Sequence, residues 1–259
     1  MRHIILVIAL GLASHFNFVH AQENTDSETD VFSDDAAFAD DAFDDDFGDF
    51  DDLDEEDLAP LVHDPLESFN RKVFWFNDKL YFYAIKPVAK AYRVVPEPAR
   101  KSVSNFFSNL TSPLRMGNAL LQGKFNDAGV ELGRFMYNTS LGLGGLFDPA
   151  DSLIGLRKKD EDFGQTLGHY GVEPGAYIVL PFWGPSNVRD SMGLVVDTFT
   201  DPVGLIWEDS DYWAAQAVRL TNTVSLDKDT YEAIKRDAFD PYLFLRDAYM
   251  KNRQIKVEQ

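Results

Sequence analysis

The chain of 259 residues contains no cysteine. That absence excludes disulfide bonds, thiolate metal sites and cysteine nucleophiles. Acylation of a lipoprotein cysteine is also not expected. If the protein sits on a membrane, its own surface must therefore hold it there.

The motifs of common catalytic sites are missing as well. The sequence has neither a Gly-x-Ser-x-Gly elbow nor a His-Glu-x-x-His helix, and the glycines of Leu141–Gly145 lack the lysine of a nucleotide loop. His169, set among glycines and a tyrosine, is more typical of a structural residue. Basic residues form no clustered stripe, which argues against nucleic acid. We therefore expect no enzyme, no cofactor and no metal site.

The first residues predict export. A basic start at Met1–His3 precedes the apolar run Ile4–Ala13, which is shorter than the roughly 20 residues that span a bilayer. Small residues at Val19–Ala21 then match a cleavage site, so we expect a signal peptide at 1–21. An uncleaved anchor or a buried helix is the alternative.

Negative charge is concentrated in one segment. Residues 23–57 contain 18 of the 43 Asp and Glu residues and no Lys or Arg, whereas residues 58–259 are almost neutral, with 25 acidic and 23 basic residues. Such a density of like charge predicts a disordered, Phe-rich tail over 22–58. A solubilising linker, a docking strap and a calcium site all remain open for it. The domain is expected over 59–259.

The first predicted helix is unusually apolar. Asp64-Pro65 provides a helix start. In a separate part of the chain, the acidic run Asp160–Asp162 indicates a solvated loop with internal charge pairing. Apolar residues recur after Pro65 at steps of three and four, namely Leu66, Phe69, Val73, Phe76, Leu80 and Tyr83. Phe74, Trp75, Tyr81 and Phe82 cover much of the remaining circumference. Such a helix is either buried centrally or faces lipid.

Further helices separated by prolines follow, so the predicted fold class is all-α. The expected segments are Pro96–Leu110, Pro113–Gln122, a helix capped by Asn126 or Asp127 that runs to Leu141 with Leu132, Phe135 and Met136 inward, a stripe of Val188, Met192, Val195 and Phe199, then Trp207–Val224 and Pro241–Arg253. Tyr177–Phe182 is the one stretch that favours a strand.

A glycine-rich apolar segment separates two of these helices. Leu141-Gly142-Leu143-Gly144-Gly145-Leu146-Phe147 places three glycines among large apolar residues. Glycine permits tight turns and close backbone approach. The segment is thus either a tight turn between packed helices or, in a lipid-facing protein, a hinged gate.

Ordered sequence blocks over about residues 64–250 resemble the MlaA (VacJ) family. The blocks are Asp64-Pro65-Leu66-Glu67-Ser68-Phe69-Asn70-Arg71, Phe76-Asn77, Pro87-Val88-Ala89, Gln122-Gly123, Arg134-Phe135, Asn138-Thr139, Gly142–Asp148, Asp162–Gly168, Leu180–Pro185, Arg189-Asp190 and Arg246–Tyr249. The acidic tail and the missing cysteine depart from the family, many of whose members are lipoproteins.

The resemblance implies a helical ring embedded in the inner leaflet of the outer membrane of Gram-negative bacteria, with a central amphipathic channel. It implies removal of phospholipid misplaced in the outer leaflet, transfer to a periplasmic carrier protein and association with a trimeric porin. A scaffold that recruits partners without moving lipid is the alternative. The implied site residues are Gly142, Leu143, Gly144, Gly145 and Phe147 in a channel hairpin, Phe74, Trp75, Phe76, Asn77 and Asp78 in an early ring helix, and Arg134, Arg189 and Asp190 as polar lining or, equally, as structural ion pairs.

Overall fold

The computed structural model describes residues 62, 64–206, 209–227 and 229–259. The predicted signal peptide and acidic tail lie outside the described residues. The elements in chain order are α3 (Glu67–Leu80), the π-helix η4 (Tyr81–Ile85), α4 (Lys86–Tyr92), α5 (Glu97–Leu110), α6 (Ser112–Leu121), α7 (Phe125–Ser140), α8 (Pro149–Ile154), α9 (Phe163–His169), β1 (Tyr177–Leu180), β2 (Gly184–Asn187), α10 (Val188–Thr200), α11 (Pro202–Ile206), α12 (Asp209–Leu226), α13 (Thr230–Asp237) and α14 (Pro241–Glu258). The prediction of a mainly helical fold is confirmed.

Prolines and short polar caps set most of the helix starts. Proline occupies an early position in several helices, where its missing N–H costs no hydrogen bond; examples are Pro98, Pro113, Pro149 and Pro241. Polar side chains accept hydrogen bonds from free N–H groups at four starts; these caps are Asp148, Asp162, Asn187 and Asp240. The starts predicted for α5, α6 and α14 are therefore confirmed to within a residue or two.

The predicted start of the first helix is wrong by two residues. α3 begins at Glu67, so Pro65 lies in the preceding turn. The Asp64 carboxylate does not cap the helix; it accepts a hydrogen bond from Asn70 Nδ2 at 2.9 Å. Asp64 instead ties the helix to elements distant in the sequence.

Two other predicted boundaries also need correction. α7 begins at Phe125 with Lys124 in the cap position, so neither Asn126 nor Asp127 caps it. The helix predicted over Trp207–Val224 is α12, which ends two residues later at Leu226, and the short helix α11 before it was not predicted. Trp207 itself lies outside the described residues.

The strand-like stretch forms half of a β-hairpin that α3 holds. β1 and β2 pair antiparallel, with Tyr177 opposite Asn187 and Leu180 opposite Gly184. On the free edge of β1, Asn70 accepts from Val179 N (2.9 Å) and donates to Tyr177 O (3.1 Å). Seven residues further along α3, Asn77 donates to Leu180 O (3.0 Å) and accepts from Phe182 N (2.8 Å). The two amides thus take the place of a third strand. Sequence patterns missed β2 because Gly184–Asn187 has no strand composition.

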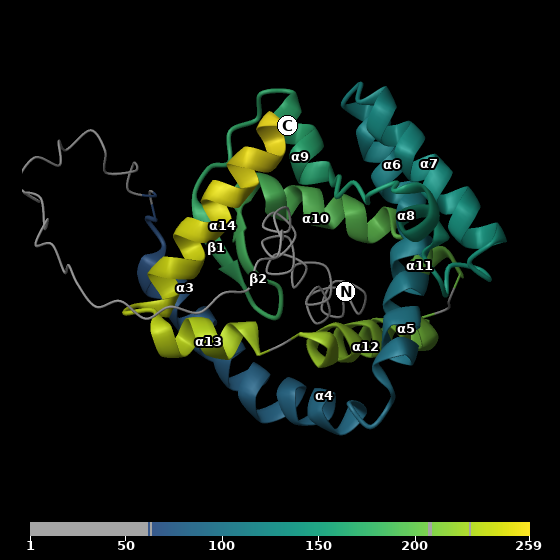
Figure 1. Cartoon of the computed structure of the whole chain (residues 1–259). Helices are drawn as coiled ribbons and strands as arrows, with labels where there is room; N and C mark the ends of the chain where they lie inside the picture. The colour runs from purple at the N-terminus through teal and green to yellow at the C-terminus, as the bar shows by residue number, and fades with distance from the viewer. Residues whose placement is uncertain (1–61, 63, 207–208, 228) are drawn as a thin grey trace, which may run out of the picture.

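The described elements follow one another around a closed ring (Figure 1). α3 continues through η4 into α4, which packs on α12; α12 packs on α5, and α5 on α6 and α7. α6 then packs on α9, α9 on α10 and α14, and α14 on β2, whose partner β1 packs on α3. Within the described residues, every helix is too short or too polar to cross a bilayer.

The two ends of the domain close this ring. Arg71 Nη2 donates to Asp240 Oδ2 at 2.9 Å, and the Arg71 guanidinium lies 4.4 Å from the centre of the Tyr242 ring. The Tyr242 hydroxyl donates to the Asp64 carboxylate. The first described turn is thereby joined directly to the start of the last helix.

Candidate functional site

Buried side chains in the described ring are predominantly polar. The hydrophobic clusters are small: one contains Val73, Tyr177, Val179, Tyr242 and Tyr249, and the other contains Tyr81, Ala89 and Val224. Several of the largest fully buried side chains are instead amides or carboxylates, namely Gln165, Glu131, Asn70, Asn187 and Asn222. Water-soluble domains bury such groups far less often than aliphatic ones.

α10 shows this inverted arrangement most clearly. Its apolar stripe is exposed over its whole length; Val188 is 41%, Met192 59%, Val195 49% and Phe199 73% exposed. Arg189, Asp190 and Gly193 form the buried face. Only glycine fits at position 193, because an added Cβ would overlap the backbone of Gly164 in α9. The helix therefore buries its polar face and exposes its apolar one.

α7 has the same polarity, which corrects a sequence prediction. Leu132 and Met136, predicted to point inward, are 46% and 60% exposed, and Phe135 is half-buried. Glu131, Arg134 and Asn138 occupy the buried face. The prediction was wrong because it assumed that apolar side chains avoid the surroundings of the protein, as they do in water.

The apolar stripe of α3 is likewise mostly exposed. Phe69, Phe76 and the flanking Trp75 are 51%, 40% and 61% exposed, whereas Val73 is buried. Exposed apolar surface on this scale marks an interaction with protein or lipid. The alternative left open by the sequence, a centrally buried helix, does not describe this face.

The segment Leu141–Phe147 forms a compact turn after α7. The N–H groups of Gly144 and Gly145 donate back to the last turn of α7, to Thr139 O (3.0 Å) and Asn138 O (2.8 Å), and Phe147 N donates to Gly142 O (3.0 Å). Four of its side chains are exposed at 40% or more; these are Leu141, Leu143, Leu146 and Phe147. We call this segment the glycine hairpin.

Each glycine of the glycine hairpin is required for a different reason. A Cβ on Gly142 would overlap the carbonyl oxygens of Asn138 and Phe147. Gly145 combines φ +93° with close approach to α5, since its Cβ would lie 2.6 Å from Asn109 Cβ. Gly144 has φ +73° but open space around it. The turn is consequently tight and packed against α5. This geometry agrees with the first sequence interpretation, a tight turn between packed helices.

Arg134 helps to hold the glycine hairpin in place. Its Nη2 donates to Asp148 Oδ2 at 2.6 Å, and Asn138 Nδ2 donates to the other Asp148 oxygen at 2.9 Å. Asn138 Oδ1 accepts from Ala150 N at 3.0 Å. Arg134 and Asn138 thus fix both ends of the turn, and the sequence did not indicate that Arg134 and the hairpin belong together.

Arg189 and Asp190 lie in a second buried network. Asp190 accepts from Arg189 Nε (3.0 Å), from Tyr249 OH (2.7 Å) and from two nitrogens of Arg253 (2.8 and 2.9 Å). Arg253 also pairs with Asp162 at 2.6 Å. Burial raises the pKa of Asp190, but the charge and hydrogen bonds of Arg253 outweigh it and hold that pKa below its ordinary value. Arg253 and Asp162 carry this network and were missed in the sequence.

A neighbouring carboxyl has the opposite shift. Burial, together with the charge of Asp162, raises the pKa of Asp197 to about 7. Asp197 accepts from Phe163 N at 3.0 Å and from Asn118 Nδ2 at 3.2 Å. The predicted solvated loop before α9 is therefore partly wrong, since Glu161 is buried against Gln122 (2.7 Å) and Asp162 caps α9.

The early-helix residues point in several directions and do not form one site. Trp75 and Phe76 are exposed, and Phe76 meets Phe182 edge to face at 5.4 Å. Asn77 holds the β-hairpin, as described above. Asp78 is buried and accepts from Lys235 Nζ at 2.5 Å. A fifth residue, Phe74, packs edge to face on Tyr242 at 5.7 Å. The segment therefore connects α3 to the β-hairpin, α13 and α14.

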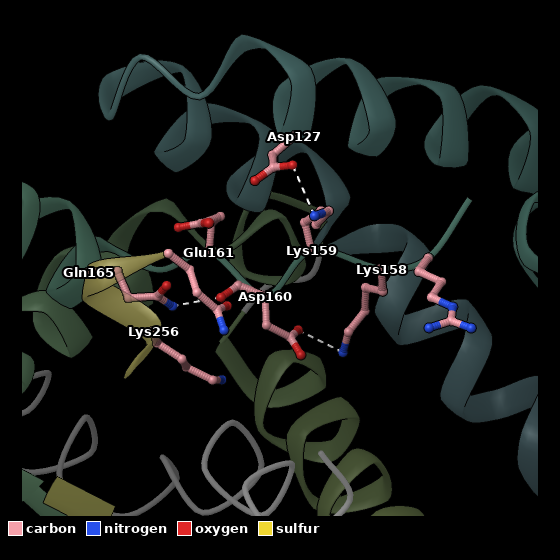
Figure 2. A pocket seen from close by; sticks show the side chains of 9 residues that line it. Asp127, Lys158, Lys159, Asp160, Glu161, Gln165 and Lys256 are labelled. Carbon is pink, nitrogen blue, oxygen red and sulfur yellow. Dashed lines mark hydrogen bonds and ion pairs between the residues drawn. The ribbon is translucent and has the colours of Figure 1, made fainter. Parts of the chain in front are cut away.

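One cavity of about 470 Å³ lies where the loop before α9 meets the end of α14 (Figure 2). Figure 2 shows Lys158 turned to Asp160 (2.7 Å) and Lys159 to Asp127 (3.1 Å), with Lys256 beside them from α14. These pairs involve two of the four basic side chains that line the cavity; Arg157 and Lys256 form no ion pair with the described residues. Within the described chain no three His, Cys, Asp or Glu side chains gather as metal ligands would.

The exposed apolar faces, buried polar networks and ring of short helices together define a class of helical protein built for apolar surroundings. Comparison with known proteins gives the family. Residues 62–256 match the family model described as MlaA lipoprotein. The chain belongs to this family.

Curated relatives and a solved structure agree with this assignment. The chain is 41% identical over 198 residues to the intermembrane phospholipid transport system lipoprotein MlaA of Escherichia coli K12, covering 74% of this chain and 77% of the relative. It is 37% identical over 207 residues to the protein of the same name from Haemophilus influenzae, covering 75% and 79%. A chain solved to explain the maintenance of bacterial outer membrane lipid asymmetry superposes with a TM-score of 0.63 at 38% identity, covering 75% of this chain and 99% of that one.

Proposed function

We propose that this protein takes mislocalised phospholipid from the outer leaflet of the outer membrane and passes it through a channel to a periplasmic carrier, so that lipid asymmetry is maintained. The observation that carries the proposal is the inverted polarity of α7 and α10, whose apolar faces are exposed and whose polar faces are buried. The names of the relatives, which are intermembrane phospholipid transport lipoproteins, support the choice of cargo.

The inverted faces would hold the ring in one leaflet. Each apolar side chain that leaves water for hydrocarbon stabilises the inserted state by about 1.5–3 kcal/mol when fully buried. The stripe of α10 alone offers four such side chains. Insertion of this kind needs no spanning helix and no acylated cysteine, in keeping with a sequence that has no cysteine.

A ring in the leaflet would also lower the free-energy cost of moving a charged head group across the membrane. Moving a charged group into hydrocarbon without partners costs far more than one protein contact can return. A polar path through the ring would spare that cost while the acyl chains remain in lipid. The direction would then be set by the carrier, and a trimeric porin would hold the ring in place.

The glycine hairpin is the proposed gate, because its apolar side chains are exposed while its backbone is fixed on α5 and α7. In Gly145→Ala the new methyl group would meet Asn109 and the backbone would be strained at positive φ. We expect a stability loss of about 2–4 kcal/mol. Outer-leaflet phosphatidylethanolamine, measured with a membrane-impermeant amine reagent, should rise toward its level in cells without the protein.

Two variants isolate the cause. Gly171→Ala strains a glycine of similar φ (+82°) that has open space around it and lies outside the hairpin, and it should leave lipid asymmetry unchanged. Asn109→Gly combined with Gly145→Ala removes the clash and should restore part of the function. Normal asymmetry in Gly145→Ala cells, with the protein folded and membrane-bound, would favour a scaffold that recruits partners without moving lipid.

A further inference from the structure

Most buried arginines of the ring have their hydrogen bonds satisfied by the protein. Arg115 donates to Glu131 (2.9 Å), to the hydroxyls of Thr111 and Ser112 (2.8 Å each) and to Ser108 O (3.0 Å). Arg253 is held by the carboxylates of Asp162 and Asp190 in the same way, and Arg134 donates to Asp148 and to Leu156 O, although its buried Nε has no acceptor among the described residues. These guanidinium groups have little capacity left for a ligand.

Arg219, on α12, is different. Its side chain is only 17% exposed, and its one ion pair in the described chain joins Nη1 to Asp201 Oδ2 at 4.0 Å, too far for a hydrogen bond. The Asp201 carboxylate is already engaged by Val203 N (3.0 Å) and Gln216 Nε2 (3.2 Å). Within the described residues the five N–H groups of Arg219 have no hydrogen-bond acceptor.

The surroundings of Arg219 leave its guanidinium partly desolvated and without a close counter-ion in the described part of the chain. Burial lowers the pKa of Arg219, Asp201 opposes that shift, and the positive charge of Arg115 adds to it. Tyr212, on the same helix, is a further polar neighbour of Arg219. A partly buried cation whose donors have no protein acceptor is available to an anionic ligand. A ligand that brings an anion would supply what the protein lacks.

We propose that Arg219 binds the phosphate of a phospholipid head group inside the ring. The planar guanidinium fork matches two phosphate oxygens, and the partial exposure of the side chain leaves a route to it. Arg219 lies in the ring wall, because α12 packs on α4, α5 and α11. This inference rests on the proposed function for its cargo.

The test uses the full chain in a non-ionic detergent and titrates dihexanoylphosphatidylglycerol by calorimetry. Arg219→Gln should weaken binding at least tenfold, and Arg219→Lys should retain part of it because a point charge replaces the fork. Arg236→Gln, the same change at an exposed arginine that bonds to neighbouring Asp237, is the matched control and should bind normally. Inorganic phosphate and dihexanoylglycerol, each half of the ligand, should both bind more weakly than the lipid.

A structural role for Arg219 predicts the reverse pattern. Without lipid, Arg219→Gln should melt at or above the temperature of the unaltered protein, since it removes an unsatisfied cation. A lower melting temperature with unchanged lipid affinity would overturn the proposal, as would equal affinity for inorganic phosphate and for the lipid. If Arg219 binds lipid while cells without the protein keep normal asymmetry, the proposed function fails and the site stands. If those cells lose asymmetry while Arg219→Gln binds normally, only the site fails.

Discussion

The two hairpins of the ring differ in what holds them. The β-hairpin of β1 and β2 is fixed by four hydrogen bonds from Asn70 and Asn77, and Tyr177 and Val179 at its base are fully buried. The glycine hairpin is held at its ends, by backbone hydrogen bonds to α7 and by Arg134 and Asn138, and it exposes four large apolar side chains. One turn is thus built into the wall of the ring, whereas the other presents apolar surface from it.

Removing the Asn70 amide should have the largest effect on this contrast. Asn70→Ala leaves Val179 N and Tyr177 O unpaired in a fully buried site, at about 1–3 kcal/mol each. We expect a loss of about 3–5 kcal/mol in the free energy of unfolding, measured by denaturant titration in detergent. Asn126→Ala, at an exposed amide, should change stability by less than about 0.5 kcal/mol. Equal losses in both variants would show that α3 does not hold the β-hairpin.

A second expected difference is pH sensitivity where α6, α9 and α10 meet, away from both hairpins. The folded-state pKa of Asp197 is about 7, above its ordinary value of 3.8. Protonation of Asp197 therefore stabilises the folded state. This stabilisation is fully present below pH 3.8 and is lost as the pH rises through 7. From pH 5 to pH 8 the loss should be about 2–3 kcal/mol. Asp197→Asn should flatten this part of the stability profile, and an unchanged profile would contradict the assignment.

The smallest expected change concerns the tip of the glycine hairpin. Leu143 has φ +54°, a conformation in which asparagine is more common than leucine, and it is 67% exposed. Leu143→Asn should alter stability in detergent by less than about 0.5 kcal/mol. In liposomes it should weaken membrane association, as assessed by flotation, because an apolar contact is lost. Unchanged flotation would place the tip outside the bilayer.

Sequence patterns identified the helices well but assigned some of their faces incorrectly. The period of three to four residues in α10 and α3 was correct because it depends on backbone geometry alone. Which side of α7 is buried depends on the surrounding medium, so Leu132 and Met136 were placed inward by a rule that holds in water. Gly142 and Gly145 could be recognised from composition, whereas the close approach of Asn109 could not.

The polar networks were the least predictable part of the site. Arg134, Arg189 and Asp190 were identified by resemblance, but their partners Asp148 and Arg253 come from separate parts of the chain. Pairing across 63 residues, as between Asp190 and Arg253, leaves no periodic signal in a single sequence. Arg219 is the clearest omission, because only three-dimensional surroundings show that its donors are unused.

The contact between the start of α3 and the start of α14 has a consequence for how the molecule is made. Arg71 and Asp240 are 169 positions apart, and Tyr242 and Asp64 are 178 apart. Closing a loop of that length costs more chain entropy than any local turn, so we expect the ring to remain open until α14 has been synthesised. Because export precedes closure in the proposed location, the exposed apolar helices would meet their membrane as an open arc, which can wrap around lipid before its ends join.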